Sequence, residues 1–206
     1  MRSLLVLIDG LGDDPIPALQ GRTPFEYASH PVMDGVAATG GLGQISICEQ
    51  DIVPESCSCI LRLLGVDKRD MPQNRAYLEL LAHGRDISEY EMVLRCNLAA
   101  VDAQGRLAGF NATGLSAVKM QEAAALCDAM LKDIEFIHLS EYRNLLVMDK
   151  EATVLHCAVR PPHESVGESV AELLAPLRQC SLSLNYFLNE TNKRLTYLAH
   201  DGLQYI

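Results

Sequence analysis

The sequence lacks any long uninterrupted apolar run. No stretch approaches the length of about 20 apolar residues that a helix needs to cross a bilayer. The charged start, Met1 and Arg2, is followed too soon by Asp9 to be typical of a secretory signal. We therefore expect a cytoplasmic protein with no membrane partner.

Positive charge is also scarce. The 206 residues carry 17 Lys and Arg against 27 Asp and Glu, so the formal net charge is -10. Binding to a phosphate backbone needs a basic face, and we therefore expect no nucleic-acid partner. Of the 17 basic residues, 12 are arginines. A guanidinium group binds phosphate or carboxylate at two points. The arginine content is therefore compatible with a small anionic ligand and also with ordinary use of arginine at the surface.

A paired-cysteine pattern is missing as well. The cysteines are odd in number and scattered among apolar neighbours, which is typical of reduced thiols that pack as small hydrophobic groups. Cys57 and Cys59 are the only close pair, and their spacing fits no usual zinc motif. The seven cysteines are at positions 48, 57, 59, 96, 127, 157 and 180.

The amino-terminal part has the pattern of an α/β protein. Leu4 to Ile8 and Gly43 to Cys48 are expected strands, and a capping box at Thr23 with Pro24 and Glu26 predicts a helix start. Further short helices are expected at residues 31–38 and 56–65. The chain is long enough for one core and a smaller appended domain.

Two polar residues stand where such a fold often binds ligands. Asp9 follows the apolar run directly, at the end of the strand where ligand sites of α/β proteins gather, but it could equally cap a loop. Ser56 opens an expected helix, whose unpaired amide groups favour a bound anion. Its alternative role is that of an ordinary helix cap.

From about residue 68 the pattern changes to a β-β-α-β-β-α order. We expect two strands around the turn at residues 102–105, a helix over residues 116–133 and two more strands around residues 149–151. The last helical stretch covers residues 167–190 and contains Pro176 as a possible kink. These elements predict a compact α+β unit of about 120 residues, and no internal repeat is seen.

Several ordered motifs resemble the archaeal-type 2,3-bisphosphoglycerate-independent phosphoglycerate mutases of the alkaline phosphatase superfamily. The likeness opens with "DGLGDDPIPALQGRTPFEYASHPVMDGVAATGGLG" and continues through "PESCSCILRLLG", "LRCNLAAVD", "EYRNLLVM" and "RPPHESVGESV". It spans nearly the whole chain. It implies a truncated alkaline-phosphatase-like α/β sheet made of residues 1–67 and 195–206, with an α+β substrate-covering domain inserted at 68–194.

The resemblance also implies a chemistry. Members of this family interconvert 3-phosphoglycerate and 2-phosphoglycerate through a phosphoserine on two divalent ions, usually manganese or zinc. Ser56 matches the nucleophile, which also contacts a metal, and Asp9 matches a metal-ligand aspartate. Residues of the inserted domain match positions that grip phosphate and carboxylate: Arg75, Arg95, Asn97, Arg143, Arg160 and His163. For Arg75 and Arg160 a solvated surface role is the favoured alternative.

Three departures from the family pattern lead us to expect impaired activity or none. The family continues well beyond the end of this chain, and its later part supplies further metal ligands. Around the nucleophile, Glu55, Cys57 and Ile60 stand where the family has a glycine, an acid and a histidine. Asp14 stands where an arginine is typical. Each change removes metal or phosphate affinity.

Two hypotheses follow from these departures. In the first, the chain is a shortened mutase that becomes active as a homodimer or with a second chain that carries the missing half. In the second, it is a non-catalytic module that binds a phosphorylated or carboxylated metabolite, with no metal of its own. The changes around Ser56 favour the second hypothesis, since a split enzyme would have reason to keep those groups.

Overall fold

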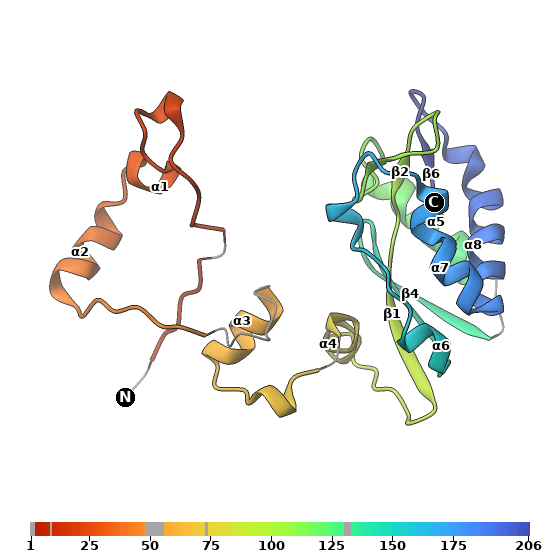
Figure 1. The fold of residues 1–206 in the computed structure, drawn as a ribbon, viewed down its shortest axis with the longest axis horizontal. Helices are drawn as coiled ribbons and strands as arrows, with labels where there is room; N and C mark the ends of the chain where they lie inside the picture. Colours follow the sequence, from red (N-terminus) through yellow and green to blue (C-terminus); the bar gives the residue numbers. More distant parts are fainter. Residues whose placement is uncertain (1–2, 9, 48–55, 73, 130–132) are drawn as a thin grey trace. The chain divides into compact units, whose positions relative to one another are not determined.

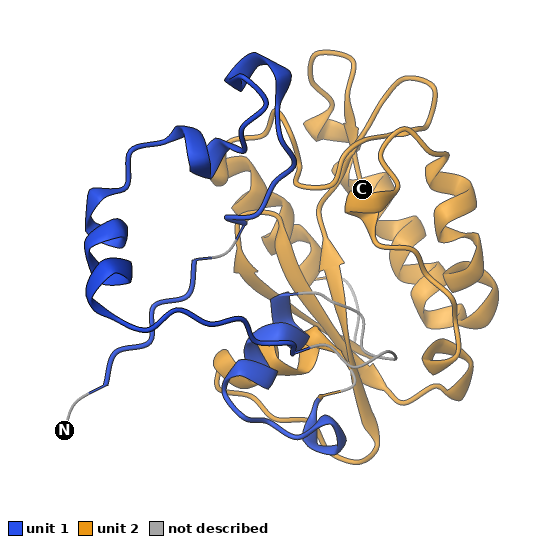
Figure 2. Ribbon diagram, turned by 60° about the vertical axis from the view of Figure 1, so that its left-hand side comes forward, with its two compact units in different colours: residues 1–71 blue, residues 72–206 orange. Residues whose placement is uncertain are grey.

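The structure is a computed structural model that describes residues 3–8, 10–47, 56–72, 74–129 and 133–206. The chain divides into two compact units, residues 1–71 and residues 72–206 (Figure 2). Each unit is described by itself. Among the described residues, no helix has the length and apolar character needed to cross a membrane.

Unit 1 consists of short helices joined by extended segments. The capping box predicted at its first α-helix is confirmed: Thr23 Oγ1 accepts from the Glu26 amide at 3.2 Å, and Glu26 Oε2 accepts from the Thr23 amide at 2.9 Å. The expected helix at 31–38 is also confirmed and runs to Thr39. The helices are η1 (Pro17–Leu19), α1 (Pro24–Tyr27), α2 (Pro31–Thr39), α3 (Ser56–Leu63) and η2 (Lys68–Asp70).

The prediction of two strands in unit 1 is wrong for the described residues. Leu4 to Ile8 and residues 43–47 are extended but paired with no other strand, while Cys48 lies outside the described residues. Their apolar side chains are exposed, with 89% of Leu4 and 72% of Ile45 accessible to solvent. An apolar run becomes a strand only when a second strand satisfies its backbone. The expected phosphatase-like sheet therefore stays a prediction.

Unit 2 holds both sheets of the described structure. The first is an antiparallel sheet in the order β1-β5-β4, and the second, much smaller, has the order β3-β2-β6. The strands are β1 (Glu91–Asn97), β2 (Ala100–Val101), β3 (Leu107–Gly109), β4 (Ile134–Ser140), β5 (Arg143–Asp149) and β6 (Gln204–Tyr205). The helices are α4 (Arg75–Ala82), α5 (Ala117–Asp128), α6 (Ala152–Leu155), η3 (Pro162–Glu164), α7 (Val170–Cys180), α8 (Leu182–Leu195) and η4 (Thr196–Leu198).

One of the two predicted strand turns lies where we expected it. Asp102 Oδ1 accepts from the amides of Gln104 and Arg106 at 2.9 Å, which closes the turn between β2 and β3. The turn expected at residues 149–151 is wrong, because β4 and β5 are joined at residues 141–142. Residues 152–155 form α6 instead.

Helices cover both faces of the β1-β5-β4 sheet (Figure 1). On one face α4 buries Ala76 and Leu80 against the strands, where Leu145 is fully buried. On the other face α5, α7 and α8 close a second apolar cluster around Phe136 and Phe187. The sheet is thus the middle layer of an α/β/α sandwich.

The last helical region is broken at a different residue from the one predicted. Pro176 lies inside α7, and the chain instead separates α7 from α8 at Ser181. Ser181 has extended backbone angles, and its hydroxyl caps α8 by accepting from the Leu184 amide at 3.1 Å. A local cap therefore decides where the second helix begins.

The carboxyl-terminal segment packs within unit 2. The structure groups residues 195–206 with residues 72–194. The expected division, in which residues 195–206 belong to a phosphatase-like core with residues 1–67, stays a prediction. β6 pairs with β2, and Leu195, Leu198 and Tyr205 are buried in a cluster with Ala100. Burial of these three apolar side chains explains the placement.

Candidate anion-binding site

Alternation along β1 places two of the expected ligand-binding residues on the face that α4 covers. Val93 is buried in the apolar cluster that includes Ala76 and Leu80 of α4, and Arg95 and Asn97 follow Val93 at spacings of two residues. Directly opposite them on β5 are Leu145 and Arg143. Cross-strand partners point to the same side of a sheet, so Arg95, Asn97 and Arg143 share this face.

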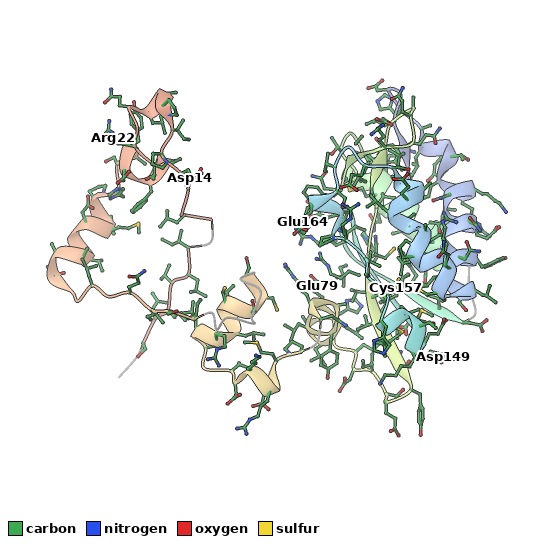
Figure 3. The ribbon with its side chains drawn as sticks, in the orientation of Figure 1. Asp14, Arg22, Glu79, Asp149, Cys157 and Glu164 are labelled. Atoms are coloured by element: carbon green, nitrogen blue, oxygen red, sulfur yellow. The ribbon has the colours of Figure 1, made fainter. Side chains whose placement is uncertain are left out.

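Glu79 of α4 lies between two arginines on this face. Its Oε1 is 3.2 Å from Arg75 Nε, one helical turn earlier, and its Oε2 is 3.1 Å from Arg95 Nε. Figure 3 labels Glu79 on α4. The Glu79 side chain is 18% exposed, against 55% for Arg75 and 35% for Arg95. The carboxylate is therefore the more buried group, and the guanidinium groups reach solvent.

Glu79 and Arg95 form an ion pair and not a directed hydrogen bond. Glu79 Oε2 is buried and has no hydrogen-bond partner, although Arg95 Nε lies within ion-pair distance of it. An ion pair of this kind leaves the guanidinium donors of Arg95 incompletely used. Arg95 can thus bind a further acceptor without giving up Glu79.

Arg143 adds a third guanidinium group at the start of β5. Its pKa is raised by a hydrogen bond with Tyr142 and by the charge of that side chain, and further by the carboxylates of Glu141 and Glu79. The guanidinium carbon lies 5.3 Å from the centre of the Tyr142 ring. Arg143 therefore stays charged at all ordinary pH values.

We call Arg75, Glu79, Arg95, Asn97 and Arg143 the Glu79 cluster. Its three guanidinium groups and one carboxylate leave two positive charges in excess, or one if Glu141 is counted too. In addition, Asn97 Oδ1 is buried and has no hydrogen-bond partner. The cluster therefore offers cationic donors for an anion and one acceptor for a hydroxyl or amine.

Arg160 and His163 lie outside the Glu79 cluster. Arg160 forks onto both carboxylate oxygens of Glu168. His163 is exposed, with its ring edge-on to Phe110 at a centroid distance of 6.1 Å. Arg160 and His163 line a cavity of unit 2 that Arg95 and Asn97 also line, and Arg75 and Arg143 are not among its lining residues.

The residues expected to carry phosphoryl transfer are in unit 1. Ser56 is the first residue of α3 and is exposed, and half-buried Cys57 and Cys59 follow on the same helix. Asp9 lies outside the described residues. Over the described part of the chain, no three His, Cys, Asp or Glu side chains come together as metal ligands would. The described residues therefore do not make up a two-ion site.

Sequence reasoning missed Glu79, which organises the cluster. A signal for it was present, since Arg75 and Glu79 are four residues apart on a helix and such pairs face each other. The link from Glu79 to Arg95 had no such signal, because it depends on how α4 packs on the sheet. The α/β/α sandwich and the arginine-rich face together define unit 2 as an α+β unit with a cationic cluster on one face of its sheet.

Comparison with known proteins identifies the family. A family model described as 2,3-bisphosphoglycerate-independent phosphoglycerate mutase matches residues 37–198, which include α3 and nearly all of unit 2. This chain belongs to that family. The resemblance found in the sequence motifs is thereby confirmed.

Curated relatives agree with this assignment, and a solved structure shares the fold. The chain is 32% identical over 175 residues to a mutase of this name from Methanothermobacter thermautotrophicus, covering 83% of this chain and 42% of the relative. A mutase from Thermococcus kodakarensis is 31% identical over 167 residues, covering 80% and 40%. The PH0037 protein from Pyrococcus horikoshii shares the fold, with a TM-score of 0.55 and 23% identity, over 96% of this chain and 48% of that one. The chain thus spans less than half the length of these proteins.

Proposed function

We propose that this chain binds a small phosphorylated or carboxylated metabolite at the Glu79 cluster and has impaired or no mutase activity by itself. The observation that carries the proposal is the gathering of Arg75, Arg95 and Arg143 around the single carboxylate of Glu79. Guanidinium groups are the preferred partners of phosphate and carboxylate because they offer paired donors. Small cytoplasmic metabolites of central carbon metabolism are the expected ligands.

The unpartnered Asn97 Oδ1 narrows the ligand class. Asn97 stands directly opposite Arg143 in the strand register, so an anion held by Arg143 lies near this acceptor. A buried acceptor without a partner costs free energy that a ligand hydroxyl recovers. A hydroxy acid phosphate such as 3-phosphoglycerate offers the anion and the hydroxyl together.

The mutase reaction itself needs more than the described residues offer. In the family reaction, a divalent ion such as manganese or zinc lowers the pKa of the serine hydroxyl and offsets charge on the phosphoryl group. Ser56 is the proposed nucleophile and Asp9 a proposed ligand. Each ion commonly takes four to six ligands, and these two residues do not fill two such sites.

A second candidate function is that of one half of a split metalloenzyme. Its support is the exposed apolar stretch Leu4 to Ile8, a type of surface that natural proteins usually cover. Under this proposal the chain pairs with a second copy or with a chain that supplies the missing ligands. Mass measurement in solution tests pairing with a second copy, because a monodisperse monomer rules out the homodimer.

Calorimetric titration with 3-phosphoglycerate tests the binding proposal. We expect measurable binding to the native chain and a loss of about tenfold or more in Arg95→Gln and Arg143→Gln, since a charged hydrogen bond contributes about 1.5–3 kcal/mol. Arg194→Gln is the matched control, because Arg194 is exposed on α8 and lies outside the cluster. Equal affinity in all four proteins contradicts the site.

A separate assay tests the activity. Turnover of 3-phosphoglycerate is measured with added manganese, first on the chain alone and then with the carboxyl-terminal part of a relative. No turnover is expected from the chain alone. Turnover by the chain alone overturns the impaired-activity proposal, and turnover only after addition of the second part supports the split enzyme.

A further inference from the structure

Unit 2 contains a cavity of about 440 Å³ on the sheet face opposite the α4 side. Strand residues such as Leu94, Phe136 and Leu146 line it from the sheet, and Leu177 and Phe187 line it from α7 and α8. Its lining is predominantly apolar. Cavities that bind small molecules commonly measure about 300–1,000 Å³ and combine apolar walls with a few polar groups.

Two lining residues, Asn97 and Asn192, have a buried side-chain oxygen without a partner. The side chain of Asn97 belongs to the α4 face by strand alternation, so Asn192 is the acceptor on the α8 side of the cavity. Asn192 lies on the same face of α8 as Leu188 and Leu195, at helical spacings of four and three residues, and all three line the cavity. The Oδ1 of Asn192 is buried and makes no hydrogen bond. A buried carbonyl oxygen of this kind is an acceptor for a donor that enters the cavity.

The charged residues in the lining are already paired. Arg95 lies against Glu79, and Arg160 forks onto Glu168. Arg160 is balanced by Glu168, and the Arg95 side chain belongs to the α4 face by strand alternation, so neither guanidinium group is an unpaired charge among the apolar lining residues. The lining thus favours a neutral ligand, in contrast to the Glu79 cluster.

We propose that this cavity is a second ligand site, which binds a small neutral apolar molecule whose hydroxyl group donates to Asn192 Oδ1. The apolar body packs against leucine and phenylalanine side chains, and the hydroxyl donates to the unpartnered acceptor that α8 supplies. The cavity shares the strand residues Arg95 and Asn97 with the Glu79 cluster, whereas Arg75, Glu79 and Arg143 do not line it. It gives unit 2 a role in sensing or carrying an apolar compound.

Two matched probes test the proposal on the full chain. Calorimetric titration compares p-cresol with toluene, which has the same ring and methyl group but lacks the hydroxyl. We expect both to bind and p-cresol to bind about threefold to tenfold more tightly, the net effect of one hydrogen bond. Failure of both probes to bind, or equal affinity for both, overturns the proposal.

Matched variants locate the site. Asn192→Leu removes the acceptor at similar size, so the preference for p-cresol should disappear while toluene still binds. Ala123→Leu, on the buried side of α5, should weaken binding of both probes by narrowing the cavity, whereas the exposed Ala125→Leu on the same helix should not. A preference that survives Asn192→Leu, or affinities that Ala123→Leu leaves unchanged, contradict the assignment.

Separate controls check that the variants fold and that ligand binding at the Glu79 cluster is distinct from binding in the cavity. Thermal unfolding followed by circular dichroism checks each variant, and Leu177→Phe narrows the same cavity from α7 if Ala123→Leu fails to fold. Arg143→Gln, which does not line the cavity, should lose 3-phosphoglycerate binding and keep p-cresol binding. The two proposals can therefore fail independently.

Discussion

Glu79 and Arg95 join α4 to β1, with Glu79 Oε2 3.1 Å from Arg95 Nε. Because Glu79 also contacts Arg75, its removal leaves two guanidinium groups without their shared counter-ion. We expect Glu79→Gln to lower the free energy of unfolding by about 1 kcal/mol, a value kept small because both arginines are at least a third exposed. Urea denaturation at low salt measures this.

Salt dependence distinguishes this effect from lost packing. Repulsion between the arginines is screened by added salt, so the deficit of Glu79→Gln should shrink as ionic strength rises. The control is Glu172→Gln, an exposed residue near the start of α7, which should unfold like the native chain. A deficit that does not change with salt contradicts the electrostatic explanation.

Leu145 is the best single test of the sandwich fold. It is 0% exposed and packs from β5 into the apolar cluster that includes Ala76 and Leu80 of α4. We expect Leu145→Ala to lower the free energy of unfolding of unit 2 by about 2–5 kcal/mol, since it removes buried methyl groups and leaves a cavity. Leu155→Ala is the control, because Leu155 is 47% exposed. Similar losses in both variants are inconsistent with the described core.

Elements with local signals were predicted well from the sequence. The capping box at Thr23 acts within four residues, and the turn closed by Asp102 Oδ1 depends on one short polar side chain. The turn at residues 141–142 was missed because Glu141 adopts a positive φ of 51° without glycine or asparagine. The residues at 149–151 have a stronger polar turn signal but form no hairpin.

Interactions between distant residues were the part that the sequence could not supply. Leu4 to Ile8 has the composition of a strand, yet strand formation depends on a partner elsewhere in the chain. Likewise, the resemblance pointed to Arg95 and Arg143 singly, and only the strand register and the packing of α4 bring them to Glu79. Local pattern therefore predicts elements better than it predicts sites.

Cysteine reactivity should follow burial. Burial raises the pKa of Cys96 to about 12 and that of Cys127 to about 11, so neither forms much thiolate at pH 8. With iodoacetamide at that pH, we expect buried Cys127 and half-buried Cys96, which packs against the apolar cluster around Phe136, to stay unmodified in the native chain while half-buried Cys57 on α3 reacts. Mass spectrometry of peptides measures this, and denaturant should expose all seven cysteines. Fast native labelling of Cys96 contradicts the described core.

Stability should depend on pH through Glu91. Arg85 donates to Glu91 Oε1 at 2.7 Å and the Ser88 amide donates to Oε2 at 2.8 Å, and these bonds lower the pKa of Glu91 from 4.5 to about 2. A lowered folded-state pKa means that the stabilisation is complete above about pH 4.5 and is lost as the pH falls toward 2.

The variant Glu91→Gln isolates this contribution. Compared with the native chain it should have a lower urea midpoint at pH 7, because the charged hydrogen bond with Arg85 is gone. As the pH is lowered from 4.5 toward 2, the native chain loses the same interaction and the two midpoints should converge. Glu89→Gln, an exposed change just before β1, controls for removal of one negative charge. A gap between Glu91→Gln and the native chain that stays constant from pH 7 to pH 2 means that Glu91 acts through packing and not through its charge.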